Sequence, residues 1–267
     1  MTARFISVLS LFALFFSCEN PPPAPRKAVV EPIVRDTLPK LVEEKTSPSD
    51  SGHVHIYFTV DDGPSAYSGE IRKMAESEDV PMTVFLVGSN CITDQRADFV
   101  NDYHASRLIE VGNHSFCHAF NDYDRWYLNP DGVLKDFQKN DEKMLITSKI
   151  ARLPGRAIWD FRKREKCIFP TGKSSGELLA KHGFEVFGWD VEWHYFHKTG
   201  LPKESPEQVV SSIEKHLREG DVFTKNNVVL LLHERHFQEL EEIRRLIRLL
   251  KKAGYQFSYL KNYPKEA

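Results

Sequence analysis

Short apolar runs alternate with longer amphipathic segments from about residue 54 to residue 260, and this alternation restricts the possible folds most. The runs are rich in valine, isoleucine, leucine and aromatic residues, which predicts strands over 54–60, 82–87, 106–111, 149–153, 185–189, 228–232 and 255–260. The segments between them predict helices over 68–77, 129–146, 175–182, 206–217 and 240–253. Strands that alternate with helices indicate parallel β/α units, arranged as a barrel or as an open doubly wound sheet.

The first residues of the chain predict export. Arg4 precedes an apolar stretch from Phe5 to Phe16, which is short for a bilayer span but has the length of a signal-peptide core. The stretch ends at Ser17-Cys18 and resembles a bacterial lipoprotein signal, in which Cys18 becomes the lipidated first residue of the mature chain. An ordinary secretory signal is the alternative, and both interpretations export the protein.

A proline-rich segment follows this signal. Residues 19–52 contain the run Pro21-Pro22-Pro23-Ala24-Pro25 among charged and small polar residues, so we expect a disordered, extended tether. Residues 53–267 remain for one folded domain, which is long enough to bury a single core. We therefore expect signal peptide 1–18, tether 19–52 and domain 53–267, with the protein lipid-anchored to a bacterial membrane in the cell envelope.

Charge and cysteine content narrow the classes of partner. The 267 residues carry a formal net charge of −2 with no basic excess, which argues against a nucleic-acid partner. Besides Cys18 the chain contains Cys91, Cys117 and Cys167. An odd number of thiols in an oxidising compartment leaves at least one unpaired, and the sequence assigns no pairing.

Titratable side chains stand at the ends of five predicted strands. They are Asp61-Asp62, His114 with His118, Arg152, Asp190 with Glu192, and His233-Glu234. The carboxyl ends of parallel strands meet at one edge of a β/α fold, where catalytic groups collect. Each residue alone is more often a turn or surface residue, but the ordered set predicts one site.

The spacing of two histidines indicates a metal. His114 and His118 are four residues apart, and on a helical turn this spacing places both imidazoles on one face. With a carboxylate from Asp61 or Asp62, they would form a three-ligand site that leaves a position open for water. A divalent ion lowers the pKa of such a water and polarises a carbonyl. The second aspartate would accept the proton of the attacking water, and His233 would return a proton to the leaving group.

At these positions the chain resembles the polysaccharide deacetylase family of carbohydrate esterases. The similar segments are TVDDGP at 59–64, HSFCH at 114–118, RLP at 152–154 and LLH at 231–233. The resemblance spans roughly residues 54–260. It implies a distorted (β/α) barrel with about seven strands and a divalent metal ion, for which zinc is expected, with cobalt or nickel as alternatives.

The resemblance also implies a role for each residue. Asp62, His114 and His118 would bind the metal, Asp61 would be the general base, Arg152 would orient Asp61 and His233 would be the general acid. The fourth motif of the family usually has an aspartate directly before a tryptophan, and this aspartate tunes the catalytic histidine. Glu192 precedes Trp193 here, and Asp190 competes with it for that role.

The implied activity is removal of acetyl groups from an N-acetylated glycan, such as peptidoglycan or a chitin-like amino sugar. Three alternatives stay open: an O-acetyl esterase, a catalytically silent glycan-binding lipoprotein, and a hydrolase of a non-sugar amide. Aromatic residues near the strand ends suit sugar rings or the core, and we expect Trp189 in the core. The spacing of His194, His197 and His236 does not indicate a metal site, so we expect these histidines to lie on the surface or to pack against other side chains.

Overall fold

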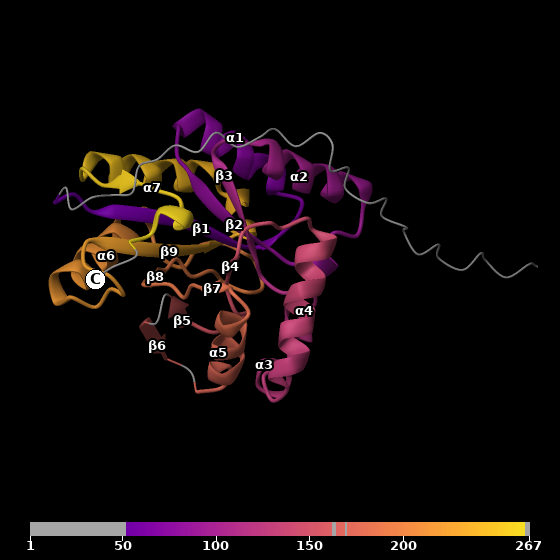
Figure 1. The fold of residues 1–267 in the computed structure, drawn as a ribbon. Helices are drawn as coiled ribbons and strands as arrows, with labels where there is room; N and C mark the ends of the chain where they lie inside the picture. Colours follow the sequence, from indigo (N-terminus) through magenta and orange to yellow (C-terminus); the bar gives the residue numbers. More distant parts are fainter. Residues whose placement is uncertain (1–51, 162–163, 169, 265–267) are drawn as a thin grey trace, which may run out of the picture.

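The computed structural model describes residues 52–161, 164–168 and 170–264 (Figure 1). The predicted signal peptide, Cys18 and nearly all of the predicted tether lie outside the described residues. None of the helices in the described ranges is long and apolar enough to cross a membrane.

Ten strands of the described chain form one curved sheet. Their bounds are β1 His55–Gly63, β2 Met82–Leu86, β3 Ile109–Asn113, β4 Ile150–Ala151, β5 Ile158–Phe161, β6 Arg164–Cys167, β7 Glu185–Val186, β8 Val191–Glu192, β9 Asn227–His233 and β10 Gln256–Phe257. Along the sheet the order is β6-β5-β7-β4-β3-β2-β1-β9-β8, and β10 pairs with the start of β1. The two ends of this path do not meet, so the sheet is a curled half-barrel.

The stretch β7-β4-β3-β2-β1-β9-β8 contains seven strands that all run parallel to their neighbours. The hairpin β5–β6 extends this stretch with antiparallel pairing on β7. The predicted distorted (β/α) barrel with about seven strands is therefore confirmed, with strands that are shorter than expected at β4, β7 and β10.

Helices lie outside the curved sheet. Their bounds are α1 Ser68–Glu78, α2 Asp94–Ala105, α3 Tyr123–Trp126, α4 Pro130–Lys143, α5 Lys173–Lys181, α6 Pro206–Glu219 and α7 Leu240–Lys252. Helices α1, α2 and α7 lie on one side in Figure 1, and α4 and α5 lie on the other. Helix α7 shows why they dock, because Ile243, Leu246, Ile247 and Leu250 form a single buried stripe.

The centre of the sheet is its most regular part. Strands β1 and β9 pair from His55 with Asn227 to Asp61 with His233, and nearly all their residues are buried. A strand buried on both faces needs apolar residues throughout, as in the run from Val228 to Leu232. This rigid pair ends with Asp61 and His233 side by side, so two residues from distant parts of the sequence reach one edge.

Several described elements had no counterpart in the sequence expectations, namely helices α2 and α3, strand β8 and the hairpin β5–β6. Helix α2 buries only Val100 and Tyr103, so its apolar stripe is too thin for a periodicity signal. The hairpin β5–β6 lies before α5 in a stretch for which the sequence predicted no strand.

Candidate metal centre

The end of β1 brings two consecutive aspartates into the same pocket. Side chains normally alternate between the faces of a strand, so Asp61 and Asp62 would be expected to point apart. The pairing of β1 with β2 shifts register between Val60 and Gly63, and Asp62 has a left-handed backbone with φ of 73°. This bulge turns both carboxylates into the pocket, with Asp61 2% exposed and the Asp62 side chain 35% exposed.

The two histidines lie on an irregular loop after β3. His114 follows the strand directly, and His118 begins a short turn, His118–Asn121, in which all four residues have positive φ. The predicted ordinary helical turn is therefore wrong, although the two imidazoles still meet, with ring centroids 5.2 Å apart. Left-handed backbone is costly for residues other than glycine, so surrounding contacts must hold this loop.

Buried hydrogen bonds supply that support. Asn113 donates to the Phe137 carbonyl at 2.8 Å, and its side-chain oxygen accepts from the backbone of Ser115 at 2.9 Å. The Asp136 carboxylate accepts from the backbone N–H groups of Phe116 at 2.6 Å and Cys117 at 3.1 Å. Helix α4 thus holds the loop in place through the carboxylate of Asp136 and the main-chain carbonyl of Phe137.

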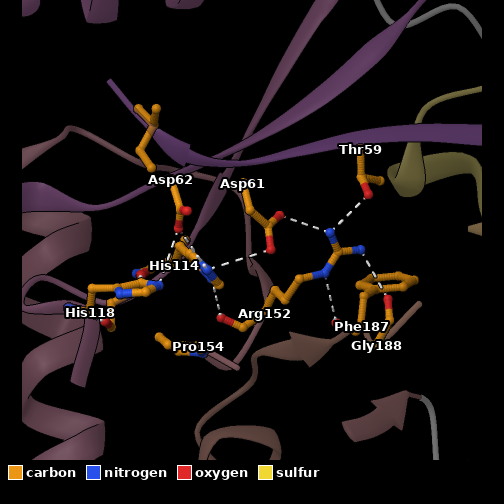
Figure 2. A network of polar contacts seen from close by, with 12 residues as sticks. Thr59, Asp61, Asp62, His114, His118, Arg152, Pro154, Phe187 and Gly188 are labelled. Atoms are coloured by element: carbon orange, nitrogen blue, oxygen red, sulfur yellow. Dashed lines mark hydrogen bonds and ion pairs between the residues drawn. The ribbon is translucent and has the colours of Figure 1, made fainter. Parts of the chain in front are cut away.

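The structure brings together the three residues proposed as metal ligands. One ligand atom from each of Asp62, His114 and His118 lies within 4.8 Å of the others, and no other group of this kind occurs in the described chain. Oδ1 of Asp62 lies 3.1 Å from Nε2 of His118 and 3.7 Å from Nε2 of His114. Figure 2 shows the three side chains converging on one point.

The hydrogen bonds of His114 select its tautomer. Its Nδ1 lies 2.9 Å from the backbone carbonyl of Arg152, and a carbonyl only accepts, so Nδ1 carries the proton. The lone pair of Nε2 therefore faces the two aspartates and is free to bind a cation. Such a contact behind the ligand is typical of histidines that bind metals. In the same way, Nδ1 of His118 contacts Oδ1 of Asn121 at 3.2 Å.

The charges of the triad suit a cation. Burial lowers the pKa of His114, which keeps this imidazole neutral, as ligation requires. Enclosure opposes ionisation of Asp62, but His118, His233 and His114 outweigh it and hold the pKa of Asp62 below its usual range. Burial also opposes a charge on His118, yet the hydrogen bond to Asp62 raises the pKa of His118. The protein thus places a negative charge between imidazoles, where a divalent ion would replace a proton.

A buried arginine holds Asp61. Arg152 is fully buried, and its Nη1 donates to Oδ1 of Asp61 at 2.8 Å and to the Thr59 hydroxyl at 2.8 Å (Figure 2). Its Nη2 donates to the Gly188 carbonyl at 2.9 Å, and its Nε donates to the Phe187 carbonyl at 3.3 Å. These contacts fix the guanidinium plane, and with it one oxygen of Asp61. The other oxygen lies 3.4 Å from Nε2 of His114, so Asp61 borders the metal centre.

His233 lies across the pocket at the end of β9. The ring of Tyr195 packs against it edge-on, with centroids 5.0 Å apart, and the ring of His236 lies 6.1 Å away. Its Nδ1 is buried and has no hydrogen-bond partner in the described chain. This imidazole therefore differs from the carboxylate-tuned histidine that the resemblance implies.

Neither candidate for tuning His233 reaches it with a hydrogen bond in the described chain. The Asp190 carboxylate accepts from the backbone N–H groups of Phe223 at 2.7 Å and Val229 at 2.8 Å, so it braces the sheet. Glu192 lines the pocket, with its carboxylate 3.9 Å from Nε2 of His194. Of the two residues expected to compete for the tuning role, Asp190 therefore supports the sheet and Glu192 lines the pocket.

Glu234 supports the pocket from behind. It is 1% exposed and accepts from the hydroxyl groups of Ser68 at 2.8 Å and Tyr103 at 2.9 Å. A β-carbon on Gly63 would lie 2.4 Å from its carboxylate, so only glycine fits at that position. Glu234 therefore connects the β1–α1 turn to β9.

The pocket has a volume of about 830 Å³ and takes its walls from loops after several strands. Trp189 lines it and is partly buried, and it also packs against the core that contains Trp159, so its expected place in the core is confirmed only in part. Trp159 and Trp193 are fully buried. His194 and His197 also line the pocket, which periodicity could not reveal because both lie in the irregular segment after β8. His236 is fully buried, as a packing residue should be.

Cys117 does not join the metal group, although it stands between the two histidines in sequence. Burial, followed by the nearby Asp136 charge, raises the pKa of its thiol to about 12. A thiol held protonated in this way is a poor ligand, because metals bind the thiolate.

The fold is a β/α half-barrel, and a candidate metal centre lies at the carboxyl ends of its strands. An aspartate and two histidines form this centre, and a second aspartate, held by an arginine, lies beside it. Such an arrangement is typical of a hydrolytic site. The sequence profile of the polysaccharide deacetylase family matches residues 49–154, which include Asp61, Asp62, both histidines and Arg152. This part of the chain is therefore similar to the polysaccharide deacetylase family.

Individual proteins are also similar to the chain in sequence or in fold. The chain is 26% identical over 245 residues to a peptidoglycan-N-acetylglucosamine deacetylase of Bacillus cereus, covering 88% of this chain and 82% of the relative. The catalytic domain of a peptidoglycan N-acetylglucosamine deacetylase from Eubacterium rectale has a similar fold, with a TM-score of 0.59 and 21% identity over 83% of this chain and 95% of that chain. A family 4 carbohydrate esterase pseudoenzyme from Bacillus anthracis also shares the fold, with a TM-score of 0.56 and 15% identity over 78% of this chain and 64% of that chain.

Proposed function

We propose that this protein is a metal-dependent hydrolase that removes acetyl groups from an N-acetylated glycan, such as peptidoglycan or a chitin-like amino sugar. The observation that carries this proposal is the convergence of Asp62, His114 and His118 beside an aspartate braced by Arg152. The similarity to the peptidoglycan-N-acetylglucosamine deacetylase of Bacillus cereus supports the same class of substrate.

The donor set fits a divalent ion. Asp62, His114 and His118 would hold it, because two neutral imidazoles and one carboxylate are a common ligand set for catalytic zinc and leave one side open. The bound ion would lower the pKa of a water molecule and polarise the acetyl carbonyl. Zinc is our expected ion, and cobalt or nickel would also accept these ligands.

The side chains around this centre supply the proton transfers. Asp61 would accept the proton of the attacking water, because its free oxygen faces the centre while Arg152 holds the other. His233, on the neighbouring strand, would donate a proton to the leaving amine of the sugar. Glu192 would act from the pocket wall through the charge that it adds near Arg152, rather than as a hydrogen-bonded partner of His233.

A catalytically silent glycan-binding protein is the second candidate, and one observation favours it. No carboxylate forms a hydrogen bond with the buried Nδ1 of His233 in the described chain, so this ring lacks the hydrogen-bonded partner that the resemblance implies for the acid step. The pseudoenzyme from Bacillus anthracis demonstrates that this fold exists without activity. An O-acetyl esterase would need less help from His233, because an alkoxide leaves more readily than an amide nitrogen.

Acetate release from an N-acetylglucosamine oligomer distinguishes these functions. We expect the zinc-loaded wild type to release acetate and Asp61→Asn to lose at least about 100-fold in kcat, because removal of a general base typically costs this much. Asp61→Asn should still bind zinc, since Asp61 is not one of the three ligands. Zinc and glycan binding without acetate from any N- or O-acetylated glycan would instead establish the silent binding protein.

We also propose that the protein is exported and anchored in the cell envelope through a lipid on Cys18. The support is the apolar stretch that ends at Ser17-Cys18 and the proline-rich segment after it. An envelope location would place the domain beside acetylated glycans.

A further inference from the structure

The acids of the pocket are largely neutralised by their own neighbours. Asp61 is paired with Arg152, and Asp62 faces His114 and His118. Burial raises the pKa of Glu234, whose carboxylate is also held by two hydroxyl groups. The pocket floor therefore offers little negative charge to a substrate once a cation is bound.

Three cations on the pocket wall, in contrast, have no acidic partner in the described chain. These residues, which we call the cationic wall, are Arg96, Lys203 and Arg235. Arg96 donates to the backbone carbonyl of Asn90 at 2.7 Å, and Arg235 donates to the backbone carbonyl of His197 at 3.4 Å. The guanidinium of Arg235 lies 5.1 Å from the Tyr195 ring, and the ammonium of Lys203 lies 5.8 Å from the Phe196 ring. Such contacts orient the side chains and leave their charges uncompensated.

Several other charged groups around the pocket, in contrast to the cationic wall, have charged partners. Arg156, beyond Gly155 on the opposite wall, forms an ion pair with Asp124 at 2.6 Å. His194 contacts the Glu204 carboxylate at 3.2 Å. Glu192, which also lines the pocket, lies 3.9 Å from His194.

The topology places the cationic wall on one side of the pocket. Arg96 lies in α2, just after the β2 loop; Arg235 follows β9; and Lys203 lies between β8 and α6. Strands β2, β1, β9 and β8 are consecutive neighbours in the sheet, so their loops form a continuous arc. The segment after β3 adds Tyr123 to the pocket lining, an aromatic surface that suits a neutral sugar face.

We propose that the cationic wall binds an acidic group of the substrate, so that the preferred glycan carries a carboxylate near the sugar that loses its acetyl group. This inference rests on the proposed deacetylase function and specifies its substrate class. The neutral acetamido group would enter between the metal triad and His233, while the carboxylate would lie against Arg235 and Lys203. Arginine and lysine without internal partners suit this task, since no existing ion pair has to be broken.

The test compares two substrates that differ only in charge. One is an oligosaccharide of alternating N-acetylglucosamine and N-acetylmuramic acid, whose lactyl groups carry carboxylates, and the other is its methyl ester. We expect the zinc-loaded wild type to show kcat/KM about tenfold higher for the free acid, and the preference to shrink in about 1 M salt. A ratio near one in the wild type would overturn the proposal.

Substitution then assigns the preference to these residues. In Lys203→Gln/Arg235→Gln the ratio of acid to ester should fall towards one, while Lys252→Gln, an exposed lysine on α7, should keep the wild-type ratio. A ratio that survives the double substitution would refute the proposal.

Calorimetry of both glycans with Asp61→Asn measures the same preference without turnover. If no glycan releases acetate, the deacetylase function fails while the binding ratio still tests the cationic wall. If acetate is released equally from acid and ester, and both bind equally, only the cationic wall fails.

Discussion

Asp61 and Arg152 form an ion pair in which both side chains are shielded from water, at 3% and 0% exposure. The removal of one partner leaves the other charge buried without compensation, which typically costs about 3–5 kcal/mol. We therefore expect Arg152→Met to lower the free energy of unfolding by about this amount in urea titrations. Arg152→Lys should lower it less, because lysine keeps the positive charge, but it should not match the wild type, because lysine lacks the planar guanidinium.

A double-mutant cycle separates the pair from its surroundings. Arg152→Met/Asp61→Asn has no buried charge at either position, so it should recover part of the stability that Arg152→Met loses. If the two single effects simply add, the ion pair does not couple these residues and our account of the base is wrong.

The identities of the site residues could be predicted from sequence better than their surroundings. Asp61, Asp62, His114 and His118 stand in short motifs next to strand ends, and motif order carries that information. The unpartnered Nδ1 of His233 and the pocket position of Trp189 depend on where the segment after β7 crosses the pocket. No periodicity encodes that path, because the segment has almost no regular structure.

At the scale of elements, the β1–α1 turn depends on close packing at Gly63. Its surroundings leave no room for a β-carbon, which would lie 2.4 Å from Oε1 of Glu234 and 2.9 Å from Cδ2 of Leu86. We expect Gly63→Ala to destabilise the protein by about 1–3 kcal/mol and to weaken zinc binding, since Asp62 is the preceding residue. Denaturant titration and zinc calorimetry would measure the two effects.

Gly254→Ala is the matched control, because that glycine has open surroundings but φ of +82°. Its cost should be about 1 kcal/mol, from backbone strain alone, with no change in zinc affinity. Equal effects of both variants on zinc would contradict the role given to the turn.

Strand β3 contains a buried acid far from the pocket chemistry. Glu110 accepts from the Thr83 hydroxyl at 2.8 Å and from the backbone of Lys261 at 3.3 Å, and burial raises its pKa to about 7. Because the folded state favours the protonated acid, its contribution to stability is complete below the ordinary carboxyl pKa and is lost as the pH rises through about 7.

Glu110→Gln should remove this pH dependence. The free energy of unfolding of the variant, taken relative to wild type, should be up to about 3 kcal/mol higher at pH 8 than at pH 4, since each pKa unit corresponds to about 1.4 kcal/mol. Urea titrations across this range measure the difference, and Glu219→Gln on the surface serves as a control. A pH-independent difference would mean that Glu110 does not titrate in the folded protein.

Elements with a dense apolar pattern were predictable, and sparse ones were not. Strand β9 and helix α7 have unbroken apolar signals and match their predicted ranges within a few residues. Helix α2 buries two side chains only, and β4 and β7 keep two paired residues each. Tertiary contacts rather than local pattern determine such short pieces.

At the scale of the whole molecule, the metal triad connects parts of the chain that are distant in sequence. Asp62 comes from the end of β1, and the histidines come from the loop after β3, so a bound ion would tie two segments together. We expect zinc at about 100 times its Kd to raise the free energy of unfolding by about 2.7 kcal/mol, and a chelator to reverse this. Thermal unfolding with and without zinc provides the measurement.

His118→Ala should lose most of this zinc-dependent stabilisation, whereas His104→Ala, outside the pocket, should retain it. An identical response of wild type and His118→Ala to zinc would exclude the proposed ligand set.

Barrel curvature could not be derived from periodicity alone. Parallel β/α units are compatible with a barrel and with a flat sheet, and the choice depends on β9 pairing beside β1, a contact between opposite ends of the domain. The family resemblance provided that long-range information, because it compares whole chains rather than local windows.

The hydrogen bond that orients His114 is accepted by the main-chain carbonyl of residue 152, whereas the guanidinium of the same residue holds Asp61 and does not contact His114 through a hydrogen bond. One position thus has two independent duties, one carried by backbone and one by side chain. Another amino acid at this position would keep the carbonyl that orients His114, yet Asp61 would lose its support. If His114 binds a cation and Asp61 activates water, as we propose, the two functions can therefore be inherited or lost separately.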